Sequence, residues 1–187
     1  MTEQTRTICN EAVGLIGNAK GITEIRVFSG YDDDLSIITA ALALNHPLDT
    51  GRKIIVYTLG YDPCSLGVGM LEYVKGYTDD PEEMRMMATR LIPVASSIEF
   101  IGEAEAARLA DAVDVGLVII DRINSISLSE QACLYDGLLR YAETSGVPII
   151  SLRQFLFQKD DREFVIGGIS RWLVDRMLEK TNNTIEL

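Results

Sequence analysis

The stretch Val115–Ser127 reads VGLVIIDRINSIS, in which the apolar run Leu117–Ile120 is followed directly by Asp121. A short unbroken apolar run is typical of a strand that is buried on both faces of a parallel sheet. Ligands of such sheets bind beyond the carboxyl ends of the strands. We therefore expect Asp121 at the edge where a ligand would bind, although an acid that merely ends a buried strand fits the same pattern.

The composition is that of a single acidic domain. The chain has 187 residues, of which 47% are apolar, with a formal net charge of −11 and a pI near 4.5. These values predict one domain, 1–187, with 1–22 as a helical lead-in, and they argue against long-range attraction to nucleic acid. No apolar run reaches the ~18 residues of a membrane span, and no signal peptide is evident. The three cysteines, which lack metal-ligand spacing, are expected to be reduced, mostly buried thiols of a cytoplasmic protein.

Apolar runs and amphipathic segments alternate along the chain. The runs predict strands over Glu24–Phe28, Lys53–Leu59, Ser97–Ile101, Leu117–Asp121 and Val147–Leu152. Helices are predicted over Thr7–Ile16, Leu35–Asn45, Pro63–Gly76, Pro81–Ile92, Glu103–Val113 and Ser129–Ser145. At the end, Val174–Glu179 and Thr184–Leu187 flank a turn and predict an antiparallel hairpin. This order predicts an α/β fold, a mostly parallel sheet flanked by helices with a C-terminal hairpin.

Two pieces of the chain carry a resemblance to a known family. In Gly116–Phe155, the strand that ends at Asp121 leads into a long helix and then into a strand that ends in LRQF. The second piece, Ile54–Gly76, reads IIVYTLGYDPCSLGVGMLEYVKG. Together they resemble the RecA-like ATPase domain of DnaB-type replicative helicases, a group related to KaiC-like and RecA-like proteins. The resemblance implies a P-loop NTPase type of sheet. Asp121 would be the remnant of the Walker B acid, and Gln154 the remnant of the glutamine that senses the γ-phosphate or the DNA.

The phosphate-binding loop of that family is not intact in this sequence. A working loop reads G-x-x-x-x-G-K-[ST], because its backbone N–H groups cradle phosphates while the lysine and the hydroxyl hold the γ-phosphate and Mg²⁺. Here the first glycine is Gly30, but Leu35 replaces the second glycine. Ser36 replaces the lysine and Ile37 replaces the hydroxyl residue. The resemblance thus implies a remnant of the loop rather than a phosphate site.

Two further changes point the same way. Asp32, Asp33 and Asp34 lie where the phosphates would bind, and like charges at that distance repel, so we expect the loop to reject ATP. Gly60 stands where the helicases carry the glutamate that activates water, and glycine has no side chain to act as a base. The three aspartates could instead bind a divalent cation together with Asp121, but a solvated acidic turn that caps a helix is the simpler interpretation.

These observations predict a pseudo-ATPase with no bound cofactor or metal. We expect it to bind a protein partner (a helicase, a helicase loader or a recombinase) as an accessory or regulator in DNA replication or recombination, and to act away from membranes. A homo-oligomer is also compatible with the sequence. The first alternative is an active nucleotide- or metal-dependent ATPase with a non-standard phosphate loop, using Asp121 and the aspartates around a cation.

The second alternative is single-stranded DNA binding through C-terminal loops that contain Arg153 and Arg162. Because acids are interleaved with these arginines, a solvated surface of mixed charge is the preferred interpretation. His46 is the only histidine, and its position before Pro47 in a helix-ending turn gives it no expected catalytic partner.

Overall fold

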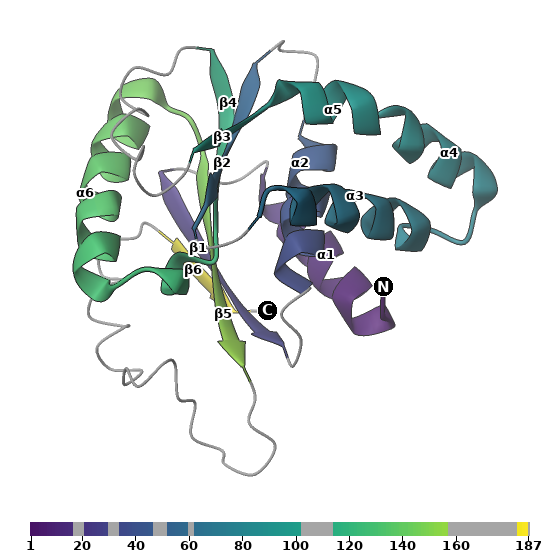
Figure 1. Cartoon of the computed structure of the whole chain (residues 1–187), viewed down its shortest axis with the longest axis horizontal. Coiled ribbons are helices and arrows are strands. Elements are labelled where there is room, and N and C mark those ends of the chain that lie inside the picture. Colours follow the sequence, from purple (N-terminus) through teal and green to yellow (C-terminus); the bar gives the residue numbers. More distant parts are fainter. Residues whose placement is uncertain are drawn as a thin grey trace.

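The structure is a computed structural model that describes residues 1–16, 21–29, 34–46, 52–59, 62–101, 114–156 and 183–186. The elements in chain order are α1 (Glu3–Ile16), β1 (Ile22–Ser29), α2 (Asp34–Asn45), β2 (Lys53–Thr58), α3 (Cys64–Gly76), α4 (Pro81–Thr89), α5 (Leu91–Ser97), β3 (Ile98–Ile101), β4 (Val115–Asp121), the 3₁₀ turn η3 (Ile123–Ser125), α6 (Leu128–Ser145), β5 (Ile149–Leu156) and β6 (Asn183–Glu186). The strands form one sheet in the order β3-β2-β4-β5-β1-β6, and every described pairing is parallel (Figure 1).

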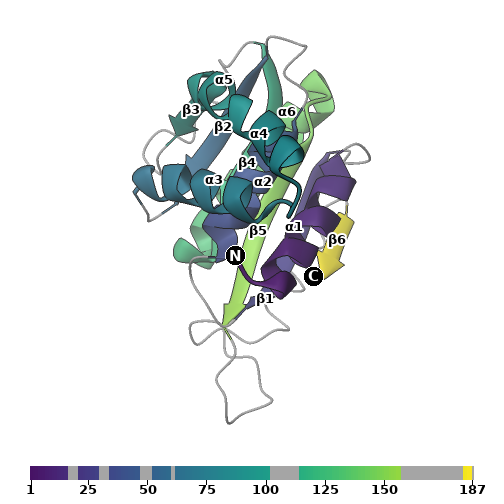
Figure 2. The same cartoon turned by 90° about the vertical axis from the view of Figure 1, so that its right-hand side faces the viewer.

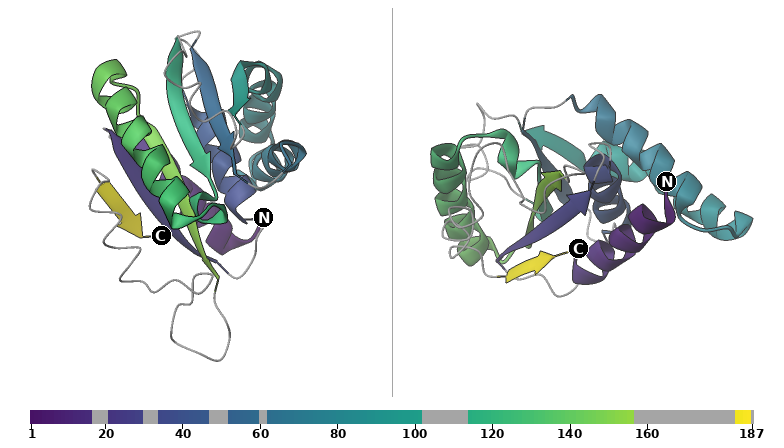
Figure 3. Two further views of the ribbon diagram at one scale, coloured as in Figure 1. Left: turned by 60° about the vertical axis from the view of Figure 1, so that its left-hand side comes forward. Right: turned by 90° about the horizontal axis from the view of Figure 1, so that it is seen from below.

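The central strand β4 is the apolar run identified in the sequence. All of its residues are buried, because β2 and β5 pair with its two edges and helices cover both of its faces. Leu117 and Ile119 belong to the core on the side of α1, α2 and α3, whereas Val118 and Ile120 belong to the core under α6. This alternation follows from the two-residue period of a strand, and it makes a three-layer structure. Figures 1 and 3 show α6 on one face of the sheet and α1, α2 and α3 on the other.

Helix ends follow local sequence signals. Ser127 and Glu130 form a capping box at the start of α6, and Gly146, at φ 68°, ends that helix in the left-handed conformation. Asp80 accepts a hydrogen bond from the Glu82 backbone N–H, which caps α4. Asp62 does the same for the backbone N–H of Cys64 at the start of α3, at 3.0 Å.

One predicted helix is two helices in the structure. The segment expected to run from Pro81 to Ile92 divides at Arg90 into α4 and α5, which extend away from the sheet (Figure 1). Pro93 explains the division: proline is tolerated in the first turn of a helix but not in its interior. Restarting the helix at Leu91 places Pro93 in that first turn.

The chain ends differ in part from expectation. Helix α1 begins at Glu3 instead of Thr7. The last strand, β6, lies parallel to β1 at the edge of the sheet (Figures 2 and 3). The predicted partner arm of the hairpin, Val174–Glu179, and the predicted helix Glu103–Val113 both lie outside the described residues.

Candidate functional site

The carboxyl edge of the sheet holds the acid singled out in the sequence. Asp121 is the last residue of β4, pairs in register with Thr58 at the end of β2, and is 0% exposed. A carboxylate so far from water requires a compensating charge or hydrogen bonds. The next residue, Arg122, supplies a charge: its Nε lies 3.9 Å from Asp121 Oδ1.

The backbone turns Arg122 back over the end of its own strand. Arg122 adopts the left-handed conformation, φ 56° and ψ 50°, which is uncommon for a residue with a side chain. Its side chain is only 16% exposed, and its terminal nitrogen donates a long hydrogen bond of 3.4 Å to Ser36 Oγ. The guanidinium therefore lies between the acid that ends β4 and the first turn of α2.

The position of Ser36 is fixed by close packing between α2 and α3. Ser36 lies in the first turn of α2 and is buried. A Cβ at Gly69 of α3 would lie 2.4 Å from the Ser36 carbonyl oxygen, closer than any side chain can approach. Gly69 thus allows the two backbones to touch, and this contact fixes the start of α2 against α3.

The other predicted site residues are only partly described. Gly30, Asp32, Asp33 and Gly60 lie outside the described residues. Asp34, predicted as the cap before a helix that begins at Leu35, is itself the first residue of α2. Gln154 lies in β5 opposite Val27 of β1. Of the predicted set, the described structure therefore brings together Ser36 and Asp121, and it adds Arg122, which the sequence analysis missed.

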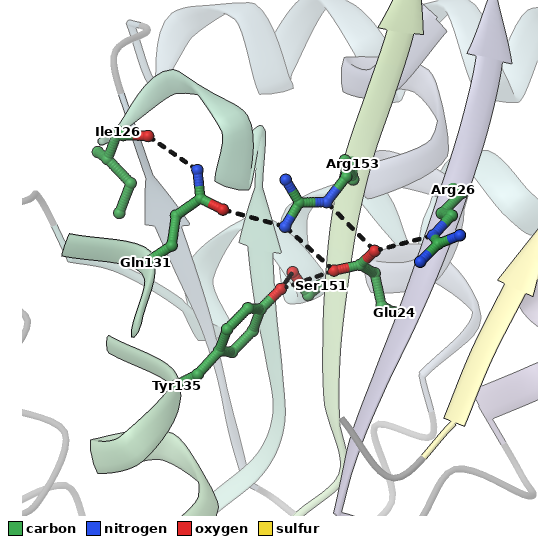
Figure 4. Close-up of polar contacts among 7 residues, drawn as sticks. All are labelled: Glu24, Arg26, Ile126, Gln131, Tyr135, Ser151 and Arg153. Atoms are coloured by element: carbon green, nitrogen blue, oxygen red, sulfur yellow. Dashed lines mark hydrogen bonds and ion pairs between the residues drawn. The ribbon is translucent and has the colours of Figure 1, made fainter. Parts of the chain in front are cut away.

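A buried polar network lies between the sheet and α6 (Figure 4). The Glu24 carboxylate of β1 accepts hydrogen bonds from Arg153 Nε at 3.2 Å and from Arg153 Nη2 at 3.3 Å. It also accepts from Arg26 Nε at 3.3 Å and from the Tyr135 hydroxyl at 2.9 Å. Arg153 Nη2 donates in addition to Gln131 Oε1 at 3.0 Å. The network ties β1 and β5 to α6.

Tyr135 is a permanent hydrogen-bond donor in this network. Its hydroxyl also lies 2.8 Å from Ser151 Oγ. Burial and then the negative charge of Glu24 raise the pKa of Tyr135 above its ordinary value. The phenol therefore stays protonated, which makes the cluster a structural arrangement rather than an acid–base pair working near neutral pH.

Arg153 does not lie on a solvated surface, so that prediction is wrong. It is 1% exposed, because it continues β5 beyond the predicted end at Leu152 and pairs with Glu24. Reversing its charge would disturb the core and could not report on DNA binding. Arg162, the other residue of that hypothesis, lies outside the described residues.

Other reactive groups do not form a second site. Cys9 is buried, as expected, whereas Cys64 and Cys133 are exposed, which corrects the expectation of mostly buried thiols; all three are free. The hydrogen bond and charge of Asp62 raise the pKa of the Cys64 thiol, which disfavours the nucleophilic thiolate. Within the described ranges, no group of three or more His, Cys, Asp and Glu side chains could hold a metal ion. In the same part of the chain, no helix has both the length and the apolar character needed to cross a membrane.

Comparison with known proteins identifies the fold. No protein-family model matches the sequence, and no curated protein matches it. Among solved structures, the chain is similar to a KaiC-like protein from the hyperthermophilic archaeon Pyrococcus horikoshii OT3. The TM-score is 0.55 and the identity 17%, over 90% of this chain and 71% of that protein. Together with the parallel sheet and its flanking helices, this similarity shows a RecA-like fold.

Proposed function

We propose that this chain is a RecA-fold protein without nucleotide hydrolysis that works by binding another protein. The observation that carries the proposal is the Arg122 guanidinium, which lies between Asp121 and Ser36. In P-loop NTPases, this region holds the lysine and the Mg²⁺ ion that neutralise the phosphates. Here a side chain of the protein itself supplies the positive charge, so the acid at the end of β4 is already compensated.

The attraction between Arg122 and Asp121 opposes the binding of a metal ion or a nucleotide, and in this sense the site is closed. Two unit charges 3.9 Å apart attract each other by about 4 kcal/mol at an effective dielectric constant near 20. A metal ion that bound Asp121 would compete with the guanidinium, and the described residues offer it no group of three or more His, Cys, Asp and Glu side chains. Ser36 stands at the position of the phosphate-loop lysine, so the second positive charge that a triphosphate needs is also missing.

The proposed partner is a helicase, a helicase loader or a recombinase, and the proposed role is that of an accessory or regulator in DNA replication or recombination. This part of the proposal rests on the resemblance of Gly116–Phe155 to replicative helicases. It is an analogy at the level of the fold, because folds of this kind serve many functions. Affinity purification from the native host tests it: recovery of a replication or recombination protein supports the role, and recovery of none removes the argument for it.

Thermal unfolding with Mg²⁺ and ATP tests the loss of nucleotide binding. A ligand at 100 times its dissociation constant stabilises a protein by about 2.7 kcal/mol, which for a chain of this size raises Tm by roughly 5–10 °C. We expect no dose-dependent rise with Mg²⁺ and ATP beyond that with Mg²⁺ and sulfate at equal ionic strength. A saturable rise that Asp121→Asn abolishes would overturn the proposal.

The second candidate is an ATPase with a non-standard phosphate loop. The complete burial of Asp121 at the carboxyl edge favours it, because such an acid is where RecA-fold enzymes bind their metal. The same titration separates the two functions. Release of inorganic phosphate from ATP, lost in Asp121→Asn and kept in Ser127→Ala at the start of α6, would establish this second candidate.

A further inference from the structure

The only histidine of the chain occupies an enclosed position at the amino edge of the sheet. His46 follows the last residue of α2 and is 7% exposed. Among the described residues, neither Nδ1 nor Nε2 of its imidazole has a hydrogen-bond partner. A Cβ at Gly116 would lie 2.6 Å from Nε2, so the ring packs directly on the backbone at the start of β4. The imidazole thus fills the junction between the end of α2 and the start of β4.

In the described part of the chain, two arginines, Arg90 and Arg52, are the charged groups that act on this ring. Arg90, between α4 and α5, donates a hydrogen bond of 2.8 Å to the His46 carbonyl oxygen and so already occupies the carbonyl end of α2. Arg52, just before β2, lies close to Gly116 beside the imidazole: a Cβ added at Gly116 would lie 3.0 Å from the Cβ of Arg52. Both charges oppose a proton on the ring, as does its burial.

The other residues at this junction offer no compensating acid among the described residues. The neighbouring turns of the packed elements are Leu42–Asn45, Leu91–Val94 and Val115–Val118, and none of them contains a titratable side chain. Lys53 is exposed and pairs with Glu99 at 3.0 Å. Asp114 is exposed and uses its backbone carbonyl to accept from the Lys53 N–H at 2.7 Å.

We propose that His46 is an acid-sensitive latch: the neutral imidazole holds the end of α2 against the start of β4, and protonation releases this contact. A proton would place a third positive charge beside two arginines in a position with almost no access to water. The ring can reach solvent only by leaving Gly116, because Nε2 faces the backbone at close range. Release therefore loosens the amino edge of the sheet, at the opposite end of β4 from Asp121.

The direction of the pH effect follows from the same contacts. Burial, followed by the charges of Arg90 and Arg52, lowers the pKa of His46. The unfolded chain takes up a proton at its ordinary pKa of about 6.5, before the folded chain does. The contribution of the latch to stability is therefore complete above that pH, and it is lost as the pH falls toward the folded-state value.

Because the chain has one histidine, its titration can be followed without assignment of competing signals. We would record the imidazole Hε1 resonance by NMR from pH 8 downward, in the full chain. The expected midpoint lies below about pH 6.5, and Arg52→Gln is expected to move it upward by removing one of the two opposing charges. A wild-type midpoint at or above the ordinary value, or no movement in Arg52→Gln, would overturn the proposal.

Amide hydrogen exchange tests the release itself. The His46 N–H, bonded to the carbonyls of Leu42 and Ala43, should lose up to tenfold protection per pH unit below the unfolded-state pKa, since its opening is coupled to one proton. The Gly146 N–H, bonded to Ala142 at the end of α6, serves as the distant control and should keep its protection. In His46→Gln the acid-dependent loss should disappear. The same loss in His46→Gln as in the wild type would show that another group is responsible.

Discussion

Removal of the Glu24 carboxylate is the perturbation with the largest expected effect on stability. Glu24 is the acid that the buried Arg153 contacts, through two nitrogens, and it accepts from Arg26 and Tyr135 as well. Glu24→Ala would leave Arg153, at 1% exposure, without its ion-pair partner among the described residues. We therefore predict that this single substitution removes a large part of the total stability.

The magnitude follows from the burial of the pair. Removing one partner of a buried ion pair costs roughly 3–5 kcal/mol, because the remaining charge is left uncompensated. Total stabilities of single domains are about 5–15 kcal/mol, so the variant should be close to unfolding. Tyr135→Phe is the matched control: it removes one hydrogen bond to Glu24 but leaves the ion pair, and it should cost about 1–2 kcal/mol.

Equilibrium unfolding in guanidinium chloride, followed by circular dichroism at pH 7, measures both losses. Replacing Glu24 and Arg153 together by Met should cost less than the sum of the two single replacements, because the double variant leaves no half of the pair behind. A loss below about 1 kcal/mol for Glu24→Ala, or additive losses in the double variant, would refute the account of the network.

Three smaller perturbations test other parts of the structure. Gly69→Ala should destabilise the protein by about 1–3 kcal/mol, because its Cβ would lie 2.4 Å from the Ser36 carbonyl oxygen. Gly67→Ala is the control: its added Cβ meets open space, so this variant should be neutral or stabilising in the same unfolding experiment. Equal effects of the two substitutions would contradict the contact between Gly69 and Ser36. Ser127→Ala should lower the free energy of unfolding by about 1 kcal/mol through loss of the capping box, while the dependence of that energy on denaturant (the m-value) stays unchanged. An unchanged stability would show that the cap is not formed. Burial raises the pKa of Tyr73 to about 12, so the free energy of unfolding should fall as the pH rises from about 10 toward that value. The fall should be smaller in Tyr73→Phe. Identical alkaline unfolding curves for the wild type and this variant would count against the explanation.

The sequence is sufficient to predict most of the sheet. The apolar runs give the positions of β1, β2, β4 and β5 because strands buried on both faces have little choice of residue. The start of α6 is also readable, since Ser127 and Glu130 have the spacing of a capping box. The break between α4 and α5 is not part of the predicted helix Pro81–Ile92, which stops just before Pro93, whereas Pro93 lies in the first turn of a new helix.

The site is less predictable, because its contacts join residues far apart in the chain. Arg122 follows Asp121 directly, and the adjacent opposite charges are a usable signal, but the left-handed backbone that aims Arg122 at Ser36 is not visible in the sequence. Glu24 and Arg153 each interrupt an apolar strand. Charged residues in strands buried on both faces must find partners, and this signal could have identified the pair.

The most direct test of the closed site is calorimetric titration of the wild-type protein with Mg²⁺ and ATP. We predict no saturable heat at millimolar nucleotide, because Arg122 compensates Asp121 and Ser36 replaces the lysine. Saturable one-to-one binding that requires Mg²⁺ and is abolished by Asp121→Asn would contradict it.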